Sequence, residues 1–204
     1  MKRLSLIASR RPRRRCSLNR VAFFVTTALV ACGSASPRPT QTDTQQSGRD
    51  PSLYYPLALG NSWTYEFTPG SRRETIQIVG RDGAWFLDDH RGRVRSDAEG
   101  VRDADQYLLH APLTAGAEWT AVQNLVVQHF VVASIDATAK TRAGSFTDCV
   151  VVRNESPLAQ GAGKFVTEWT YAPRVGLVQV RTQTISPRGT QEQSRLDLVS
   201  YRVQ

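Results

Sequence analysis

The segment Ser62-Trp63-Thr64-Tyr65-Glu66-Phe67-Thr68 is followed directly by Pro69-Gly70. Its aromatic and β-branched side chains favour a strand, and Pro-Gly is a strong turn signal. Glu74 to Val79 and Ala84 to Leu87 are also β-prone, and Asp82-Gly83 separates them. This part of the sequence therefore predicts short strands joined by tight turns.

The rest of the chain continues the same pattern. Ser186-Pro187-Arg188-Gly189 has the composition of a final hairpin turn, and after the first 31 residues we find no convincing 3.6-residue apolar period. Helices should therefore be few. Further runs rich in Val, Thr, Phe and Tyr are Leu125 to Ile135, Cys149 to Arg153, Phe165 to Tyr171, Gly176 to Ile185 and Ser194 to Val203.

These runs predict an all-β fold. We expect a single antiparallel meander of about nine or ten strands, curved into a barrel or half-barrel, because a flat sheet of that size leaves long edges exposed. A flat two-sheet sandwich stays open as the alternative.

One nine-residue pattern occurs twice. Residues 56 to 64, Pro-Leu-Ala-Leu-Gly-Asn-Ser-Trp-Thr, and residues 112 to 120, Pro-Leu-Thr-Ala-Gly-Ala-Glu-Trp-Thr, share the frame P-L-x-x-G-x-x-W-T. Pro-Leu favours a turn, Gly frees the backbone, and Trp begins a strand with its ring toward the core. We interpret the repeat as a reused strand-start motif; a duplicated ligand-binding half is the other interpretation. The residues expected in the core are Trp63, Trp85, Trp119, Cys149 and Trp169.

The first 31 residues have the three parts of a lipoprotein signal peptide. A leader with eight Lys and Arg side chains precedes an 11-residue apolar stretch from Val21 to Ala31, and Leu29-Val30-Ala31-Cys32 forms the cleavage box. The apolar stretch is too short to span a bilayer, which takes about 20 residues. The box predicts that the sulfur of Cys32 is acylated and holds the chain on a bilayer. An ordinary secretory signal is the alternative, and Arg10-Arg11 leaves the choice between Sec and Tat export open.

Removing this leader changes the charge of the protein. The leader holds 8 of the 26 Lys and Arg residues and none of the 18 Asp and Glu, so the remaining chain is balanced at 18 of each sign. The net positive charge belongs to the signal, and the rest of the chain has no basic cluster that would predict nucleic acid as a partner. Cys16 would leave with the signal, so Cys149 would be the one free thiol of the mature chain.

The sequence divides into three parts: a signal peptide at 1–31, a lipidated cysteine with a disordered tether at 32–53, and a β-rich domain at 54–204. Gly33 to Asp50 is rich in Ser, Thr, Gln and Pro and has no large apolar side chain. Gly33 rather than Asp follows the anchor, which by the enterobacterial sorting rule favours the outer membrane.

Three blocks resemble a widespread family of uncharacterised bacterial envelope lipoproteins. They are Tyr55-Pro56-Leu57 with Gly60, Trp63 and Tyr65; Ala143-Gly144-Ser145-Phe146-Thr147-Asp148-Cys149-Val150 with Val152; and Trp169-Thr170-Tyr171-Ala172-Pro173 with Val175-Gly176-Leu177-Val178. Arg174 stands where the family usually has Gly, so we expect a turn there that tolerates a side chain. The resemblance implies a β-rich secreted domain and brings no established activity.

The candidates for chemistry are few. Cys149 is the best nucleophile, with His90, His110 and His129 as bases, yet the valines after it favour a core cysteine. Asp88-Asp89-His90 resembles a metal-ligand cluster, but a hairpin turn explains it more simply. Asp97, Glu99, Asp103 and Asp105 lack the spacing of a calcium loop. We therefore predict no catalytic residue, no metal and no cofactor.

The function expected from the sequence is that of a non-catalytic structural or protein-interaction module on the envelope. Its partners would be the bilayer, through acylated Cys32, and an envelope protein; no small-molecule ligand can be named. Two alternatives remain: carriage of a lipid or another apolar ligand in the concave face of the sheet, and an enzyme using Cys149.

Overall fold

Strand β1 (Ser62–Thr68) has the bounds expected from the sequence. It pairs antiparallel with β2 (Arg73–Asp82) on one side and with β12 (Gly189–Arg202) on the other. Trp63 and Tyr65 point to one face and are buried, which gives the alternation of a half-covered sheet. This is a computed structural model, and it describes residues 48–123, 125–158 and 162–204.

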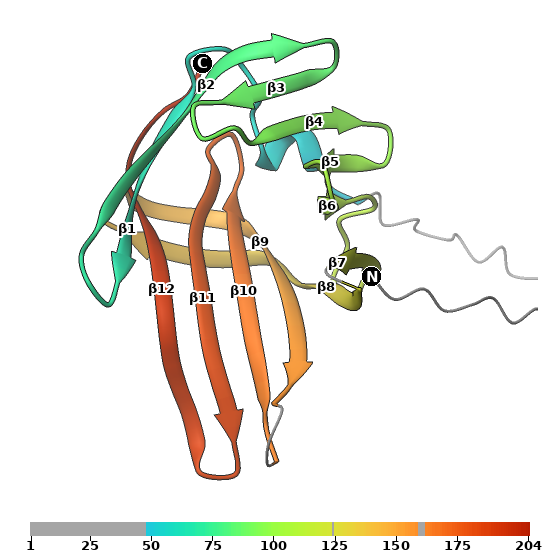
Figure 1. Cartoon of the computed structure of the whole chain (residues 1–204), viewed down its shortest axis with the longest axis vertical. Helices are drawn as coiled ribbons and strands as arrows, with labels where there is room; N and C mark the ends of the chain where they lie inside the picture. The colour runs from blue at the N-terminus through green and yellow to red at the C-terminus, as the bar shows by residue number, and fades with distance from the viewer. Residues whose placement is uncertain (1–47, 124, 159–161) are drawn as a thin grey trace, which may run out of the picture. The chain divides into compact units, whose positions relative to one another are not determined.

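The remaining strands belong to the same sheet (Figure 1). Its order is β6-β5-β4-β3-β2-β1-β12-β11-β10-β9-β8-β7, and every neighbouring pair is antiparallel. The predicted all-β meander is thereby confirmed. The other elements are η1 (Pro51–Tyr54), β3 (Trp85–Asp88), β4 (Arg93–Asp97), β5 (Gly100–Arg102), β6 (Tyr107–His110), β7 (Glu118–Gln123), β8 (Val126–Thr141), β9 (Gly144–Pro157), β10 (Lys164–Ala172) and β11 (Gly176–Ser186).

The sheet curls into a nearly closed barrel. Its two outermost strands, β6 and β7, follow each other in the chain. They are joined by a side chain rather than by a ladder: the indole N–H of Trp119 donates to the carbonyl oxygen of Tyr107 at 3.1 Å. The ring of His110 also stacks on Trp119, with centroids 6.1 Å apart. The sandwich alternative is therefore wrong, because one continuous sheet forms both walls.

Irregular pairing provides the curvature. The register shifts in β1 after Thr64, in β10 after Thr170 and in β11 after Thr182, and the β8–β9 pair shifts three times between Val132 and Ala139. Each bulge bends a strand and increases its twist. The bends let long strands such as β8 and β9 wrap around the interior instead of extending flat.

The side chains inside the curve form two clusters. One gathers around Trp119 and Phe130, whose rings stack at 5.5 Å, and the other around Trp63 and Tyr65. The buried members of the first are Tyr54, Val101, Leu109, Leu113, Trp119, Phe130, Val132, Val150, Val152 and Tyr171. Those of the second are Trp63, Tyr65, Ile78, Ala139, Cys149, Ala172, Val175, Val178 and Leu198.

The packed chain begins before Tyr54, where the sequence placed the start of the domain. Arg49 forms a β-bridge with Leu113, and Asp50 caps η1 by accepting a hydrogen bond from the Ser52 N–H at 2.9 Å. Pro51 is buried beneath this turn. Composition missed these residues because backbone pairing and one proline hold them, rather than large apolar side chains. Leu29, Val30, Ala31 and Cys32 lie outside the described residues.

The described residues form twelve strands, whereas the sequence predicted nine or ten. Arg93–Asp97, Gly100–Arg102 and Tyr107–His110 are short, and the first two are rich in charge or glycine. Their strand state comes from pairing with neighbours rather than from local propensity. The turn before β11 also differs from expectation: Arg174 adopts a φ of 61°, the left-handed backbone that glycine would prefer there.

Candidate functional site

Cys149 lies in the interior wall of β9. Its side chain is fully buried, and its Sγ–H donates weakly to the carbonyl oxygen of Thr147 at 3.7 Å. Burial raises the pKa of this thiol to about 11, so it is neutral near pH 7. The three histidines lie on other elements: His90 in the β3–β4 turn, His110 on β6 and His129 on β8. No imidazole is hydrogen-bonded to the thiol among the described residues, which places Cys149 with the core side chains.

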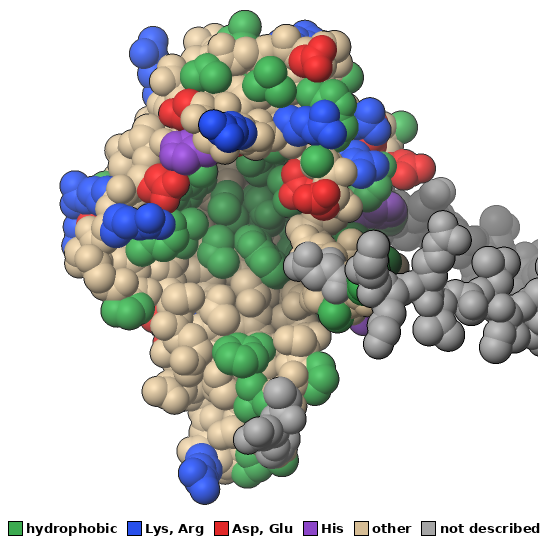
Figure 2. Space-filling model, viewed as in Figure 1, with side chains coloured by type: hydrophobic (Ala, Val, Ile, Leu, Met, Phe, Trp, Pro, Cys, Tyr) green, Lys and Arg blue, Asp and Glu red, His purple; other side chains and the backbone are tan. Residues whose placement is uncertain are grey.

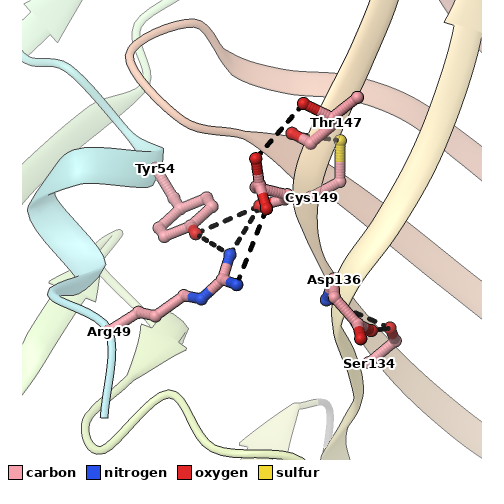
Figure 3. Close-up of polar contacts among 7 residues, drawn as sticks. Arg49, Tyr54, Ser134, Asp136, Thr147 and Cys149 are labelled. Atoms are coloured by element: carbon pink, nitrogen blue, oxygen red, sulfur yellow. Dashed lines mark hydrogen bonds and ion pairs between the residues drawn. The ribbon is translucent and has the colours of Figure 1, made fainter. Parts of the chain in front are cut away.

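A polar cluster beside Cys149 fastens the start of the domain to β9 (Figure 3). The Arg49 guanidinium donates to the Tyr54 hydroxyl at 2.6 Å and to the carbonyl oxygen of Asp148 at 2.9 Å. The Tyr54 hydroxyl donates to that same carbonyl at 3.1 Å. We call Arg49, Tyr54 and Asp148 the N-terminal clamp.

The clamp depends on an unusual backbone at Asp148. This residue has a φ of 55°, which turns its carbonyl oxygen out of the strand ladder and toward Arg49. Its carboxylate is two-thirds exposed and lies 3.9 Å from Arg49 Nη2. Nothing in this geometry activates a nucleophile; it holds a chain segment in place. The sequence signal that could have found it is Asp50-Pro51, a helix cap followed by proline at the first position.

The Asp88-Asp89-His90 group forms a turn, as expected. His90 Nδ1 lies 2.8 Å from the Asp89 carboxylate, and His90 Nε2 lies 3.1 Å from Glu74. Asp88 accepts hydrogen bonds from the backbone N–H groups of His90 and Gly92 at 2.8 and 2.6 Å. These contacts close the β3–β4 hairpin and raise the pKa of His90, first through the hydrogen bond with Asp89.

The second acidic group also serves turns. Asp97 accepts from the N–H of Glu99 at 3.0 Å, and Asp103 accepts from the N–H groups of Asp105 and Gln106, both at 2.8 Å. Within residues 48–123, 125–158 and 162–204, no three His, Cys, Asp or Glu side chains are arranged to hold a metal ion.

The repeated motif builds the same structure twice. Gly60 and Gly116 both have a φ of 84°. Gly60 N–H donates to Ile78 O at 2.9 Å, and Gly116 N–H donates to Val132 O at 2.8 Å, so each turn is tied to the strand that pairs with the one it starts. This shared geometry supports the strand-start interpretation.

The tryptophans that follow these turns are held by their indole nitrogens as well as by packing. Trp63 Nε1–H donates to Val175 O at 2.7 Å, and Trp119 donates to Tyr107 O. Both rings are buried, and Trp169 is half-buried against Phe130. Trp85 differs from the core position expected for it: it is half-buried, with the guanidinium groups of Arg93 and Arg95 each 4.9 Å from the ring.

The cavity beside Trp63 is small. Apolar side chains gather at the middle of the face seen in Figure 2, and charged groups lie around them. The cavity lined by Tyr55, Trp63, Ile78, Phe86 and Asp88 has a volume of about 20 Å³. Since ligand pockets usually enclose about 300–1,000 Å³, this cavity has room for about one water molecule and is too small for an acyl chain.

Larger depressions lie in two other places. One of about 190 Å³ lies between β7, β8 and β9 and is lined by side chains such as Glu118, His129 and Arg153. The other, about 630 Å³, lies at the β11–β12 turn around Pro187 and Arg188. Across the described part of the chain, no helix has the length and apolarity needed to span a membrane.

No protein-family model matches this chain, and no curated protein matches it. Two solved structures are similar at low identity. One is named as a lipoprotein from Parabacteroides distasonis ATCC 8503: it is 14% identical, with 76% of this chain and 100% of that chain covered and a TM-score of 0.41. The other is named as an exported protein with a YmcC-like fold from Bacteroides fragilis NCTC 9343: it is 14% identical, with 74% of this chain and 99% of that chain covered and a TM-score of 0.40.

Proposed function

We propose that this protein is a bacterial envelope lipoprotein whose β domain is a non-catalytic structural or protein-interaction module. The anchor would be Cys32, since Leu29-Val30-Ala31-Cys32 follows a basic leader and a short apolar stretch. Gly33 after the anchor favours the outer membrane as its location. The resemblance of the three sequence blocks to envelope lipoproteins supports the same assignment.

The close packing of the buried side chains is the main observation that supports this module over a lipid carrier. A carrier needs apolar side chains that line an empty cavity, whereas here Trp119 stacks on Phe130 in one cluster and Trp63 is buried in the other. The cavity beside Trp63 has a volume of only about 20 Å³. A domain built this way acts through its outer surface.

Native mass spectrometry separates this proposal from lipid carriage. The full chain, purified from envelopes in a mild detergent, is expected to carry the mass of its own acyl groups and no further lipid. Lipid that stays bound at a fixed ratio would instead favour the carrier, and would require the Trp63 and Trp119 clusters to open.

Thiol labelling tests the remaining alternative, an enzyme that uses Cys149. The thiol is buried and its pKa is raised to about 11, so the folded protein should not react with a thiol reagent near pH 7. The unfolded protein should react fully. Fast labelling of the folded chain would make Cys149 a reactive cysteine and would contradict a non-catalytic domain.

The anchor is tested by Cys32→Ser, with Cys16→Ser as the matched control within the leader. Cys32→Ser should release folded protein from the membrane fraction into the soluble fraction, while Cys16→Ser should leave membrane association unchanged. Membrane association of Cys32→Ser equal to the parent chain would rule out lipidation at this residue.

A further inference from the structure

The end of the β7–β8 hairpin exposes aliphatic side chains to solvent. Leu125 is 97% exposed, Val122 is 64% exposed, and Val126 and Val127 are 55% and 54% exposed. We call these four residues the apolar tip. Single exposed apolar residues are common on protein surfaces, but a contiguous group marks an interaction site.

The aliphatic side chains of the apolar tip lie on both faces of the hairpin and at its turn. Val122 and Val127 are directly opposite each other across the ladder and share the outer face of the hairpin. Val126 lies opposite Gln123, on the face that carries the buried rings of Trp119 and Phe130 further back. Leu125 occupies the turn itself. A flat protein surface would cover only one face of the hairpin, whereas the hydrocarbon of a bilayer would surround both faces and the turn.

Neither packing nor backbone geometry explains a leucine at residue 125. Its φ is 65°, a conformation in which a branched side chain is unfavourable and glycine or asparagine is usual. Its side chain also has almost no contact within the domain. In addition, no Asp, Glu, Lys or Arg occurs from Trp119 to Ile135, so no charged group would have to be dehydrated next to the tip.

The strand that leads to the tip, β7, begins close to Arg49, near the N-terminal end of the described domain. Arg49 N–H donates to Leu113 O at 3.2 Å, and Leu113 lies in the connection that leads into β7. The six residues of β7 extend roughly 20 Å from there. Cys32 and Gly48 are 16 residues apart, so even a fully extended chain keeps the domain within about 55 Å of an acylated Cys32. The apolar tip is within reach of the same bilayer.

We propose that the apolar tip inserts into the lipid bilayer that holds Cys32 and thereby fixes the orientation of the domain on the membrane. This inference rests on the proposed lipid anchor. The anchor limits the distance from the membrane, and the tip provides the second contact that sets which face of the barrel is turned away from it.

The test places a fluorescent label next to the tip without removing any of its four side chains. Gln123→Cys is labelled with a nitrobenzoxadiazole dye in the full-length protein, in which Cys32 is expected to be acylated and Cys149 is buried. The protein is reconstituted in vesicles of phosphatidylethanolamine and phosphatidylglycerol that contain a lipid with a spin label on its acyl chain. Val79→Cys, at a valine that is 58% exposed on β2, is the matched control.

Quenching by the spin-labelled lipid is expected at residue 123 and not at residue 79. Adding Leu125→Asp should lower the insertion equilibrium constant at least about tenfold, because burial of one leucine exceeds the free energy of a tenfold change. Val79→Asp should leave the quenching at residue 123 unchanged.

The outcomes against the proposal are separable. Equal and weak quenching at residues 123 and 79 in an acylated protein would overturn insertion of the tip while leaving the anchor intact. A dye shift at residue 123 without lipid quenching, together with crosslinking between copies, would make the tip a contact between two chains instead. An intact mass without acyl groups would overturn both the anchor and this inference.

Discussion

Trp63 and Trp119 each make a hydrogen bond to a residue distant in the sequence, and a phenylalanine could not make it. Their indole N–H groups satisfy the carbonyl oxygens of Val175 and Tyr107. A buried carbonyl left without a donor has a desolvation cost that packing does not recover. These two residues therefore couple core packing to the connections between distant strands.

We predict that Trp63→Phe and Trp119→Phe each lower the free energy of unfolding by about 1–3 kcal/mol, the cost of leaving a buried acceptor unpaired. Trp85→Phe is the control, because its ring is half-buried and its contacts are cation–π contacts that phenylalanine partly keeps. Its effect should be about 1 kcal/mol or less. Urea unfolding measures all three, and equal losses would show that ring volume rather than the N–H matters.

The backbone conformation of Arg174 determines its contribution to the free energy of unfolding. Its φ of 61° is costly for any side chain with a Cβ, while its N–H donates to Leu53 O at 2.6 Å and must stay in place. We predict that Arg174→Gly raises the free energy of unfolding by up to about 1 kcal/mol. Arg174→Ala keeps the Cβ and should give no such gain. Thermal unfolding of both variants checks the prediction, and a gain of the same size in Arg174→Ala would assign it to the side chain instead.

At the scale of elements, the β3–β4 turn combines two carboxylates with one histidine. The hydrogen bond with Asp89, and then the attraction of Glu74, raise the pKa of His90 in the folded protein above its unfolded value. The protonated imidazole is thus favoured by folding. Its stabilising effect is fully present below the unfolded pKa, about 6.5, and is lost as the pH rises through the higher folded pKa.

We predict that an NMR titration finds the pKa of His90 above that of an unstructured histidine, and that Asp89→Asn lowers it. Glu74→Gln should lower it less, because the Asp89 contact is the larger cause. Exchange of the turn amides should accelerate as the pH rises through the His90 titration, beyond the general effect of base. An unchanged His90 pKa in Asp89→Asn would mean that the ion pair does not form in solution.

The strands show which elements local sequence can specify. Ser62–Thr68 forms a strand with the bounds that its side chains predict, because aromatic and β-branched residues alternate there. Arg93–Asp97 has no such alternation, and it becomes a strand because its neighbours offer unpaired backbone groups on both sides. Propensity therefore found the long strands and the short β3, and it missed β4, β5 and β6.

At the scale of the whole molecule, the N-terminal clamp joins residues 49 to 54 to the barrel. Arg49 and Tyr54 both bond to the carbonyl oxygen of Asp148, almost a hundred residues away in sequence. The clamp therefore connects this segment to β9.

We predict that Arg49→Gln accelerates hydrogen exchange in residues 49 to 55 while leaving β9, β10 and β11 protected, because it removes contacts of the segment and not of the sheet. Arg72→Gln is the control, since Arg72 makes an exposed ion pair with Glu74. Exchange measured by mass spectrometry distinguishes the two. Acceleration throughout the barrel in Arg49→Gln would mean that the clamp supports the fold as a whole.

By itself, the sequence determined the β class, the long strands, the strand-start motif around Trp63 and Trp119, and the prediction of a lipid anchor at Cys32. Each of these depends on neighbouring residues or on composition, which a single chain displays directly. The tertiary structure alone decided the closure between β6 and β7, the N-terminal clamp and the apolar tip of the β7–β8 hairpin. Those features depend on which distant residues come into contact and which stay exposed. Local side-chain preferences do not specify either.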